Sequence, residues 1–508
     1  MKNQGKHFVP IRTLLVLLGL ALVACASQQS DQDFIGAGAG PGEGSLAGSP
    51  GAAVTTPGLT PSAGDATQGS DTVGAPGASG GAPDGAGAPG GAAPGDDESG
   101  ASNPSDGVGV SDPGQGNSQG GTTDVPPDDT WYNYEDNVAA SPAPPGGLSS
   151  AQVPMFVAFG FDDNAYSGLE GSGGTGGMQW ALEMAASRRN PAGAGNARTH
   201  DGEPVRFSFY YTSTYIGSWI SESPVYVKKI WREAYEAGHE VGNHTFDHEH
   251  GASFTKDLWL EQMQACNDSL TLPFDPAEVS FEPQDSAGIG VPLEQIYGFR
   301  TPFLEYNDST LQAAREMGLW YDCSIEEGWH WEQNGTNFNW PYTLDSGSPG
   351  HEILVDWGSK EAITSHPGLW ELPTYVLIAP PDELAASYGI QPGLRAKLKG
   401  IASWFDEAGG KITGFDYNLW VSFQMTKAEY LATLKHSLDL RLQGNRAPFM
   451  LGAHTDYYSS KYTAPPASTA RERQEAMEEF LDYALSRPEV RVVPIKDILD
   501  WVRAPVAL

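Results

Sequence analysis

From about residue 150 to the C-terminus, apolar runs of strand length alternate with segments whose apolar residues recur at helical spacing. Uninterrupted apolar runs predict buried strands over 153–161 and 205–213, whereas 225–238 has helical periodicity and a glycine stop at Gly238. The same criteria predict strands over 239–245, 296–303, 319–324, 369–375, 447–454 and 490–495, and helices over 255–270, 307–318, 426–444, 470–485 and 496–504. This alternation predicts an α/β fold with a parallel sheet or barrel.

Polar residues stand at the ends of several predicted strands. The carboxyl ends of parallel strands share one edge of a sheet, so these side chains are expected to meet there. An adjacent pair of carboxylates after an apolar strand is costly to bury unless it is paired or binds a metal. We therefore predict one site built from Asp162, Asp163, His244, His248, Arg300 and His454.

The segment EVGNHTFDHEHG (240–251) places three histidines and two acids between positions 244 and 250. Two imidazoles four residues apart, as in His244 and His248, can point the same way, and one carboxylate completes a three-ligand catalytic metal site. A second carboxylate can then act as a base. The His-x-x-x-His spacing alone is weak evidence, because it is common on solvated helix faces. His250 is either an alternative ligand or an exposed loop residue.

The N-terminus has the pattern of a targeting segment. Lys2, Lys6 and Arg12 precede the apolar run LLVLLGLALVA, and LVAC ends at Cys25. LVAC resembles the lipobox of bacterial lipoproteins, which implies that residues 1–24 are a signal peptide and that Cys25 is acylated. An ordinary secretory signal is the alternative. We expect this lipid to be the only membrane attachment, and the protein to lie in the cell envelope, at the outer membrane, or outside the cell.

Composition separates a linker from a folded domain. Residues 25–129 are rich in Gly, Ala, Pro, Ser and Asp and have almost no large apolar side chains, so a disordered linker is expected. Aromatic residues become frequent near residue 130, and 130–508 is predicted to be one catalytic domain with long insertions. The net charge of -35 argues against nucleic acid as a partner, because phosphate contacts need clustered Lys and Arg. We expect a monomer.

Four short motifs occur in order along this domain: FDD (161–163), HTFDH (244–248), RTPF (300–303) and LGAH (451–454). They resemble the motifs of the NodB-homology polysaccharide deacetylases, carbohydrate esterase family 4. YDCSI, WPYTLD, NRAPFMLGAH and VPIKDILDWV extend the resemblance to insect-type chitin deacetylases. The resemblance implies a distorted (β/α) barrel of about seven strands.

The resemblance also implies how the metal and the base are held. Asp163, His244 and His248 match the family's ligands for zinc or another divalent metal. Asp162 matches the general base that activates the attacking water. Arg300 matches the residue that holds this base and keeps it ionised, since an opposite charge lowers a carboxylate pKa.

Two further roles follow from the same resemblance. The backbone N–H of Phe303 matches the group that stabilises the oxyanion. His454 matches the general acid that protonates the leaving amine. The implied reaction is hydrolysis of an N-acetyl group on a polysaccharide that contains N-acetylglucosamine, chitin-like or peptidoglycan, with release of acetate.

The sequence departs from the family pattern in two places. The family commonly has Thr before and Gly after FDD, where this chain has Gly160 and Asn164, and Asn164 is expected to affect access to the metal. The motif that supplies a carboxylate beside His454 is not clear. The candidates for this motif are Asp322, Trp329, Trp370 and Glu371.

Aromatic residues are concentrated in the irregular segment 327–342. Long loops of this kind are uncommon unless they are functional. Because sugar rings stack on aromatic faces, we interpret Trp331, Trp340 and Trp370 as one wall of a glycan groove. The alternative is that these residues cover the barrel's own apolar surface.

Two cysteines remain once Cys25 is assigned to the lipid. In an oxidising compartment, leftover cysteines often pair, so a Cys266–Cys323 disulfide is a candidate. Neither cysteine has a C-x-x-C neighbour, which argues against zinc binding by either.

Two other functions are compatible with this sequence. One is a catalytically silent glycan-binding lipoprotein, against which the intact Asp162 and His454 argue. The other is an amidohydrolase of a small non-sugar amide, for which a narrow pocket would be expected rather than long aromatic loops.

Overall fold

The structure, a computed structural model, describes residues 132–216, 222–275, 288–463 and 467–508. The predicted signal peptide (1–24), the acylated Cys25 and the linker (25–129) lie outside these residues and stay predictions. Among the helices in the described part, none combines the length and the apolar character needed to cross a membrane.

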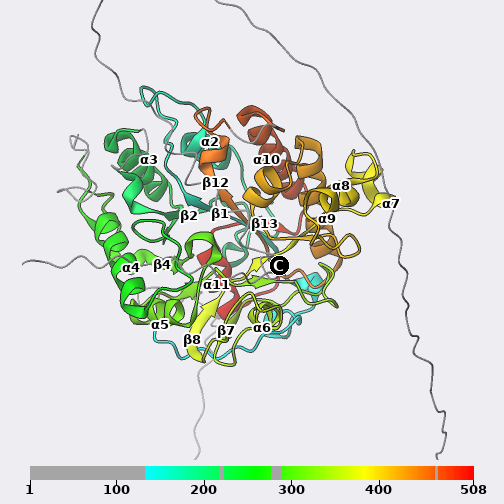
Figure 1. Cartoon of the computed structure of the whole chain (residues 1–508), viewed down its shortest axis with the longest axis horizontal. Coiled ribbons are helices and arrows are strands. Elements are labelled where there is room, and N and C mark those ends of the chain that lie inside the picture. The colour runs from blue at the N-terminus through cyan, green and yellow to red at the C-terminus, as the bar shows by residue number, and fades with distance from the viewer. Residues whose placement is uncertain (1–131, 217–221, 276–287, 464–466) are drawn as a thin grey trace, which may run out of the picture. The chain divides into compact units, whose positions relative to one another are not determined.

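The central element is a curled, mainly parallel sheet (Figure 1). Its strand order is β12-β1-β2-β3-β4-β5-β8-β7, and β13 pairs with the first residues of β1. All of these pairs are parallel except β7–β8. The strands are β1 Met155–Asp163, β2 Ser208–Tyr211, β3 Glu240–Asn243, β4 Ile296–Phe299, β5 Tyr321–Asp322, β7 Tyr342–Leu344, β8 His366–Glu371, β12 Phe449–His454 and β13 Val490–Val492. The predicted α/β barrel-like fold is confirmed, with an open sheet.

Helices follow most strands and cover the sheet (Figure 1). Thr255 caps α4 by accepting a hydrogen bond from the N–H of Leu258, and Gly238 ends the turn after α3 with a φ of +80° that favours glycine. The covering helices are α2 Gly177–Ala186, α3 Pro224–Glu236, α4 Lys256–Thr271, α5 Asp308–Glu316, α9 Lys427–Gln443, α10 Ala470–Leu485 and α11 Ile495–Arg503.

Insertions after β5 and β8 form smaller elements at the carboxyl edge of the sheet. They are β6 Glu326–Glu327, α6 Pro349–Asp356, β9 Thr374–Tyr375, β10 Leu377–Ile378, α7 Asp382–Ala385, α8 Leu394–Ile401 and β11 Lys411–Ile412. β6 pairs with β9, and β10 pairs with β11. These short pairs anchor the long insertions that the sequence predicts.

Two apolar clusters pack on opposite faces of the sheet. Alternate residues of β1 belong to different clusters: Phe159 lies in one, and Phe156 in the other. This is the period-two alternation of a strand that is buried on both faces. Cys266 packs in the Phe159 cluster and Cys323 in the Phe156 cluster.

The expected Cys266–Cys323 disulfide is wrong, because both cysteines are free and buried. The thiol of Cys266 donates to the carbonyl of Tyr211 at 3.3 Å, and that of Cys323 to the carbonyl of Phe299 at 3.3 Å. The two thiols therefore belong to different clusters and bond to different strands.

A thiol count tests this arrangement. We expect two thiols to react per chain when a Cys25→Ser variant is unfolded without reductant and titrated with a thiol reagent. A native sample should react far more slowly, because both thiols are buried and burial raises the pKa of Cys266 to about 12. A count of zero after unfolding would instead mean that the two cysteines pair.

Candidate metal and catalytic site

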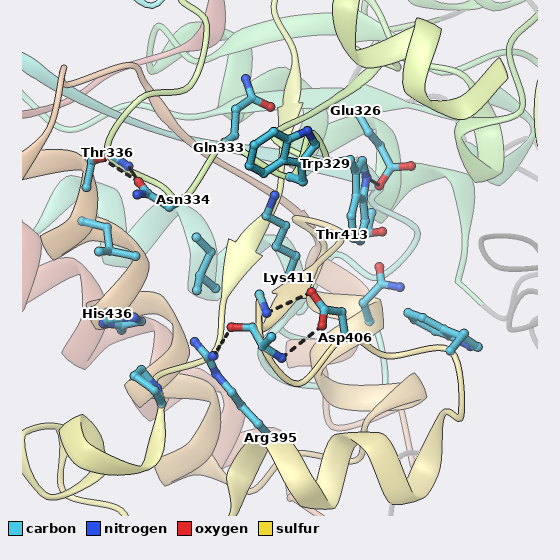
Figure 2. Close-up of a pocket in the computed structure, with 18 of the residues that line it drawn as sticks. Glu326, Trp329, Gln333, Asn334, Thr336, Arg395, Asp406, Lys411, Thr413 and His436 are labelled. Atoms are coloured by element: carbon cyan, nitrogen blue, oxygen red, sulfur yellow. Dashed lines mark hydrogen bonds between the residues drawn. The ribbon is translucent and has the colours of Figure 1, made fainter. Parts of the chain in front are cut away.

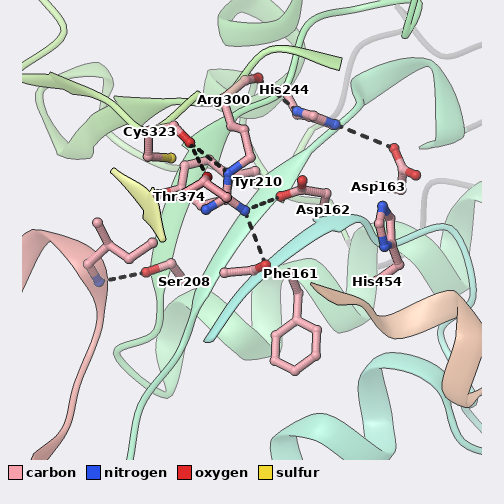
Figure 3. Close-up of polar contacts among 12 residues, drawn as sticks. Phe161, Asp162, Asp163, Ser208, Tyr210, His244, Arg300, Cys323, Thr374 and His454 are labelled. Atoms are coloured by element: carbon pink, nitrogen blue, oxygen red, sulfur yellow. Dashed lines mark hydrogen bonds and ion pairs between the residues drawn. The ribbon is translucent and has the colours of Figure 1, made fainter. Parts of the chain in front are cut away.

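The predicted site residues meet at the carboxyl edge of the sheet (Figure 3). Asp162 and Asp163 end β1, and Asp162 stands opposite His454 in the register of β1 and β12. His244 follows β3 directly, and Arg300 follows β4 directly. Parallel pairing of four strands thus places these side chains at one edge, as the sequence predicts.

Asp163, His244 and His248 form the one three-residue cluster in the described part of the chain whose ligand atoms could hold a metal ion. These atoms all lie within 4.8 Å of one another. Oδ1 of Asp163 lies 3.3 Å from Nε2 of His248 and 3.8 Å from Nε2 of His244. Ligands at about 2.0–2.2 Å in a tetrahedron around zinc would lie about 3.3–3.6 Å apart, so the cluster has the right size.

The protonation states of the cluster suit a cation. Nδ1 of His244 donates to the carbonyl of Arg300 at 2.8 Å, so Nε2 keeps its lone pair for a metal. Burial and the neighbouring His248 lower the pKa of His244 to about 3, and burial also lowers the pKa of His248. Burial alone would raise the pKa of Asp163, but His248 and His244 hold it below its usual range. Two neutral imidazoles and one carboxylate therefore fit a divalent metal.

Left-handed backbone conformations concentrate around this cluster. Asp163, Thr245 and His248 have φ values of 68°, 70° and 55°, and Phe303 has a φ of 57°. Such conformations are uncommon outside glycine and persist where the surrounding structure holds them. The strain thus falls on the segments that hold the predicted ligands and oxyanion donor, as it does in functional sites.

Asp162 is held by Arg300, as the family resemblance implies. Nη1 of Arg300 donates to Oδ1 of Asp162 at 2.8 Å and to the carbonyl of Gly160 at 3.2 Å, and both charged side chains are buried. Burial raises the pKa of Asp162 to about 6, although Arg300 lowers it. A Cβ atom at Gly160 would lie 2.9 Å from both terminal nitrogens of Arg300, so a larger residue at this position would require the guanidinium to shift.

The carboxylate partner of His454 is Asp416, which sequence reasoning missed. Nδ1 of His454 donates to one Asp416 oxygen at 2.8 Å, and the backbone N–H of His454 donates to the other at 3.0 Å. Burial opposes the charge, but Asp416 prevails and raises the pKa of His454 to about 10. The imidazole is therefore protonated at neutral pH and can serve as an acid.

The four predicted candidates for that motif lie elsewhere. Asp322 and Glu371 are register partners on β5 and β8, and Asp322 accepts from the Ser324 hydroxyl at 2.8 Å. Trp370 is fully buried, and Nε1 of Trp329 donates to Glu326 at 3.1 Å. Asp416 begins a short helical segment between β11 and α9 that the sequence does not predict, and the one signal it offered is an acid just before an aromatic stretch, DYNLW (416–420).

Phe303 and His250 lie together beside the cluster. The ring of His250 stacks on Phe303 with centroids 4.0 Å apart, and its Nδ1 lies 3.0 Å from Oε1 of Glu305. His248, and not His250, joins Asp163 and His244 in the candidate metal cluster. The backbone N–H of Phe303 is in the first turn of a short helix, Pro302–Leu304, where N–H groups lack partners within the helix.

Asn164 has a structural position rather than one that changes access to the metal. Its side chain is buried and donates to the carbonyls of Phe161 and Tyr210 at 2.9 and 3.1 Å. It also accepts from the Thr455 hydroxyl at 3.0 Å. With a φ of 66°, Asn164 supplies a turn that other side chains rarely adopt, and it ties β1 to β2 and to the segment after β12.

The three tryptophans expected to form a wall of a glycan groove differ in their exposure to solvent. Trp340 and Trp370 are 2% and 0% exposed, and both pack in the Phe156 cluster, so their expected role in binding a glycan is wrong. A fully covered indole cannot stack on a sugar, and these two residues cover apolar surface instead. Trp331 is 82% exposed, and its role stays a prediction.

A buried carboxylate held by an arginine, an imidazole paired with a carboxylate and a candidate metal cluster thus lie together at the carboxyl edge of an α/β sheet. Residues 202–283 match the family model for polysaccharide deacetylase. Chitin deacetylase 8 of Bombyx mori is 23% identical over 367 residues, which covers 72% of this chain and 74% of that protein. The chain therefore contains a polysaccharide deacetylase domain of the NodB-homology, carbohydrate esterase family 4 type.

Two solved structures are similar to this chain at low sequence identity. A putative polysaccharide deacetylase from Mycobacterium smegmatis is 17% identical with a TM-score of 0.41, covering 72% of this chain and 96% of that one. A probable polysaccharide deacetylase from Pseudomonas aeruginosa PAO1 is 14% identical with a TM-score of 0.36, covering 69% and 92%.

Proposed function

We propose that this protein hydrolyses N-acetyl groups on a polysaccharide that contains N-acetylglucosamine and releases acetate. The observation that carries the proposal is the position of Asp162 and His454 as register partners beside the Asp163–His244–His248 cluster. A base and an acid on adjacent strands can serve both proton transfers of amide hydrolysis.

Zinc is the metal we propose, held by Asp163, His244 and His248. Two imidazole nitrogens and one carboxylate oxygen are a protein donor set typical of catalytic zinc. When bound there, zinc supplies Lewis-acid activation of water and of the acetamide carbonyl.

The chain's own residues perform the remaining steps. Asp162 takes the proton of the attacking water, and Arg300 keeps its carboxylate in position through the 2.8 Å bond. The backbone N–H of Phe303 stabilises the negative charge that develops on the carbonyl oxygen. His454, protonated beside Asp416, gives its proton to the nitrogen of the sugar as the C–N bond breaks.

The similarity to chitin deacetylase 8 of Bombyx mori favours chitin-like chains over peptidoglycan as the substrate. The lipid at Cys25 would hold the enzyme at the cell envelope, with the linker extending the domain toward an insoluble polymer. These two points are part of the same proposal.

Acetate release tests the proposed function. We expect release from N-acetylglucosamine oligomers and polymeric chitin at a higher rate than from purified peptidoglycan. Stripping with a chelator should abolish release, and added Zn²⁺ should restore it, because the attacking water and the acetamide carbonyl lose their Lewis acid when the metal is removed. His248→Ala should lose both zinc binding and activity. Release that persists after complete stripping would contradict the metal dependence, and no release from any substrate would favour the silent binding protein.

A further inference from the structure

We propose that a cavity built from the insertions after β5 and β8 binds a segment of neutral glycan outside the catalytic cluster (Figure 2). The cavity has a volume of about 920 Å³, within the range of known ligand sites. None of the residues that line it belongs to the Asp163–His244–His248 cluster or to the acid and base. The choice of an acetylated polymer as the glycan rests on the proposed function, whereas the binding of sugar does not.

The distribution of exposed tryptophans is the first argument. Trp331, Trp357 and Trp404 are 82%, 48% and 42% exposed, and no other tryptophan in the described part of the chain is among the exposed large apolar residues. All three line this cavity, and Trp329 joins them with its ring centroid 5.7 Å from that of Trp357. Burying apolar surface stabilises a protein by about 25 cal/mol for each Å², and an exposed indole does not contribute this stabilisation. The clustering of exposed indoles in one cavity therefore indicates that a ligand covers them.

Polar groups between the indoles are the second argument. Figure 2 shows Lys411 near the middle of the cavity, with Gln333 and Trp329 on one side and Asp406 on the other. The side-chain amides of Gln333, Asn334 and Asn418 line the cavity, and the buried hydroxyl of Ser422 lacks a hydrogen-bond partner among the residues that the structure describes. Amides and hydroxyls beside aromatic faces suit sugar hydroxyls better than an acyl chain, which would leave these groups unpaired.

The charges that line the cavity balance. Two acids, Glu326 and Asp406, face two bases, Arg395 and Lys411. Nζ of Lys411 already donates to the carbonyl of His330 at 2.7 Å, and burial lowers its pKa to about 8. A lining with equal numbers of both signs favours a neutral chain over an anionic or a cationic polymer.

The cavity is adjacent to the catalytic site through one short segment. Thr413 and Asn418 line the cavity, and Asp416 between them holds His454 at 2.8 Å. The segments that form the cavity follow the carboxyl ends of β5 and β8, the same edge of the sheet at which the catalytic residues lie. A chain held in the cavity would therefore be kept close to the reacting edge.

Direct binding to the full chain carrying Asp162→Asn tests the proposal without turnover. We expect chitohexaose and cellohexaose both to bind in calorimetry and to change tryptophan fluorescence, because stacking on indoles does not require the acetyl group. Trp331→Ala and Trp404→Ala should each raise Kd about tenfold or more, while Trp331→Phe keeps most of the affinity. Leu293→Ala, which removes an apolar side chain that is 54% exposed outside the cavity, is the matched control and should change nothing.

Two outcomes would overturn the proposal: normal oligosaccharide binding in both alanine variants, or fluorescence changes with a long-chain fatty acid but with neither sugar. Because Trp331 is largely exposed, its replacement should leave the fold intact, which thermal unfolding checks. Acetate release by the wild-type chain is measured separately. If the wild type releases no acetate but binding depends on the tryptophans, the proposed function is wrong and the proposal of a glycan-binding cavity is supported. If the wild type releases acetate but binding does not depend on the tryptophans, the proposed function is supported and the proposal of a glycan-binding cavity is wrong.

Discussion

Replacing Asp162 with Asn is expected to lower kcat for acetate release by about 10²–10⁴-fold, the usual contribution of a general base. The substitution keeps the shape of the side chain and an oxygen that can accept from Nη1 of Arg300, now 2.8 Å from Oδ1. It removes the charge that takes up the proton. Single-turnover rates on an N-acetylglucosamine oligomer, measured with zinc in excess, give the loss directly.

Two measurements separate this loss of chemistry from a loss of structure. Asp162 is not a member of the candidate metal cluster, so zinc affinity should change little, whereas Asp163→Asn should weaken it strongly. Neutralising Asp162 leaves the buried Arg300 without its full counter-charge. Because breaking a buried ion pair can lower the free energy of unfolding by about 3–5 kcal/mol, the thermal stability of the variant must be measured together with its kinetics. A folded, zinc-loaded variant with wild-type kcat would rule Asp162 out as the base.

The sheet and its catalytic edge could be predicted because their signals are local. The apolar run before Asp162 and the helical periodicity before Gly238 each report one element, and the strand ends then define one edge. The structure confirms the α/β fold, places Asp162, Asp163, His244, His248, Arg300 and His454 there, and adds short strands of two residues. Such strands are too short for a periodic pattern, so the sequence did not predict β6, β10 and β11, whereas β9 falls within the strand predicted over 369–375.

The errors concern residues whose positions depend on long-range packing. Trp340 lies in the irregular aromatic segment 327–342, as Trp331 does, and Trp370 lies on β8. Trp340 and Trp370 are nevertheless buried, whereas Trp331 is exposed. Composition cannot distinguish an indole that covers a core from one that faces a ligand, because both have the same side chain. The same limit applies to Cys266 and Cys323, which the sheet separates into two clusters.

Asp416 is the position where sequence reasoning failed and the chemistry depends most on the answer. It accepts from both Nδ1 and the backbone N–H of His454, and it is fully buried. The backbone of its segment pairs with the sheet at one isolated bridge, Phe415 to Gly452, so no strand pattern in the sequence marks it. The candidates Asp322 and Glu371, in contrast, lie on strands that the sequence predicts.

Replacing Asp416 with Asn is expected to lower kcat by about 10³–10⁴-fold, comparable to the loss when the carboxylate that orients a catalytic imidazole is neutralised elsewhere. An amide donates where the carboxylate accepts, so His454 loses both its fixed tautomer and the charge that favours its protonated form. With Asp416 present, the pKa of His454 is raised to about 10, and the acid form persists through neutral pH. Without Asp416, that pKa falls, and the alkaline limb of kcat should move to lower pH.

The shift of this limb distinguishes positioning of His454 from a merely structural role. A variant that only loosens the fold lowers activity at every pH, whereas Asp416→Asn should lose progressively more as the pH rises through the lowered pKa of His454. His454→Ala is the matched comparison and should show a similar loss at its optimum with no limb due to this group. NMR titration of the His454 ring in both the wild type and Asp416→Asn reports the same pKa without catalysis. An unchanged alkaline limb with an unchanged His454 titration would mean that another group holds the imidazole, because the carboxylate at 2.8 Å would then contribute nothing to its charge.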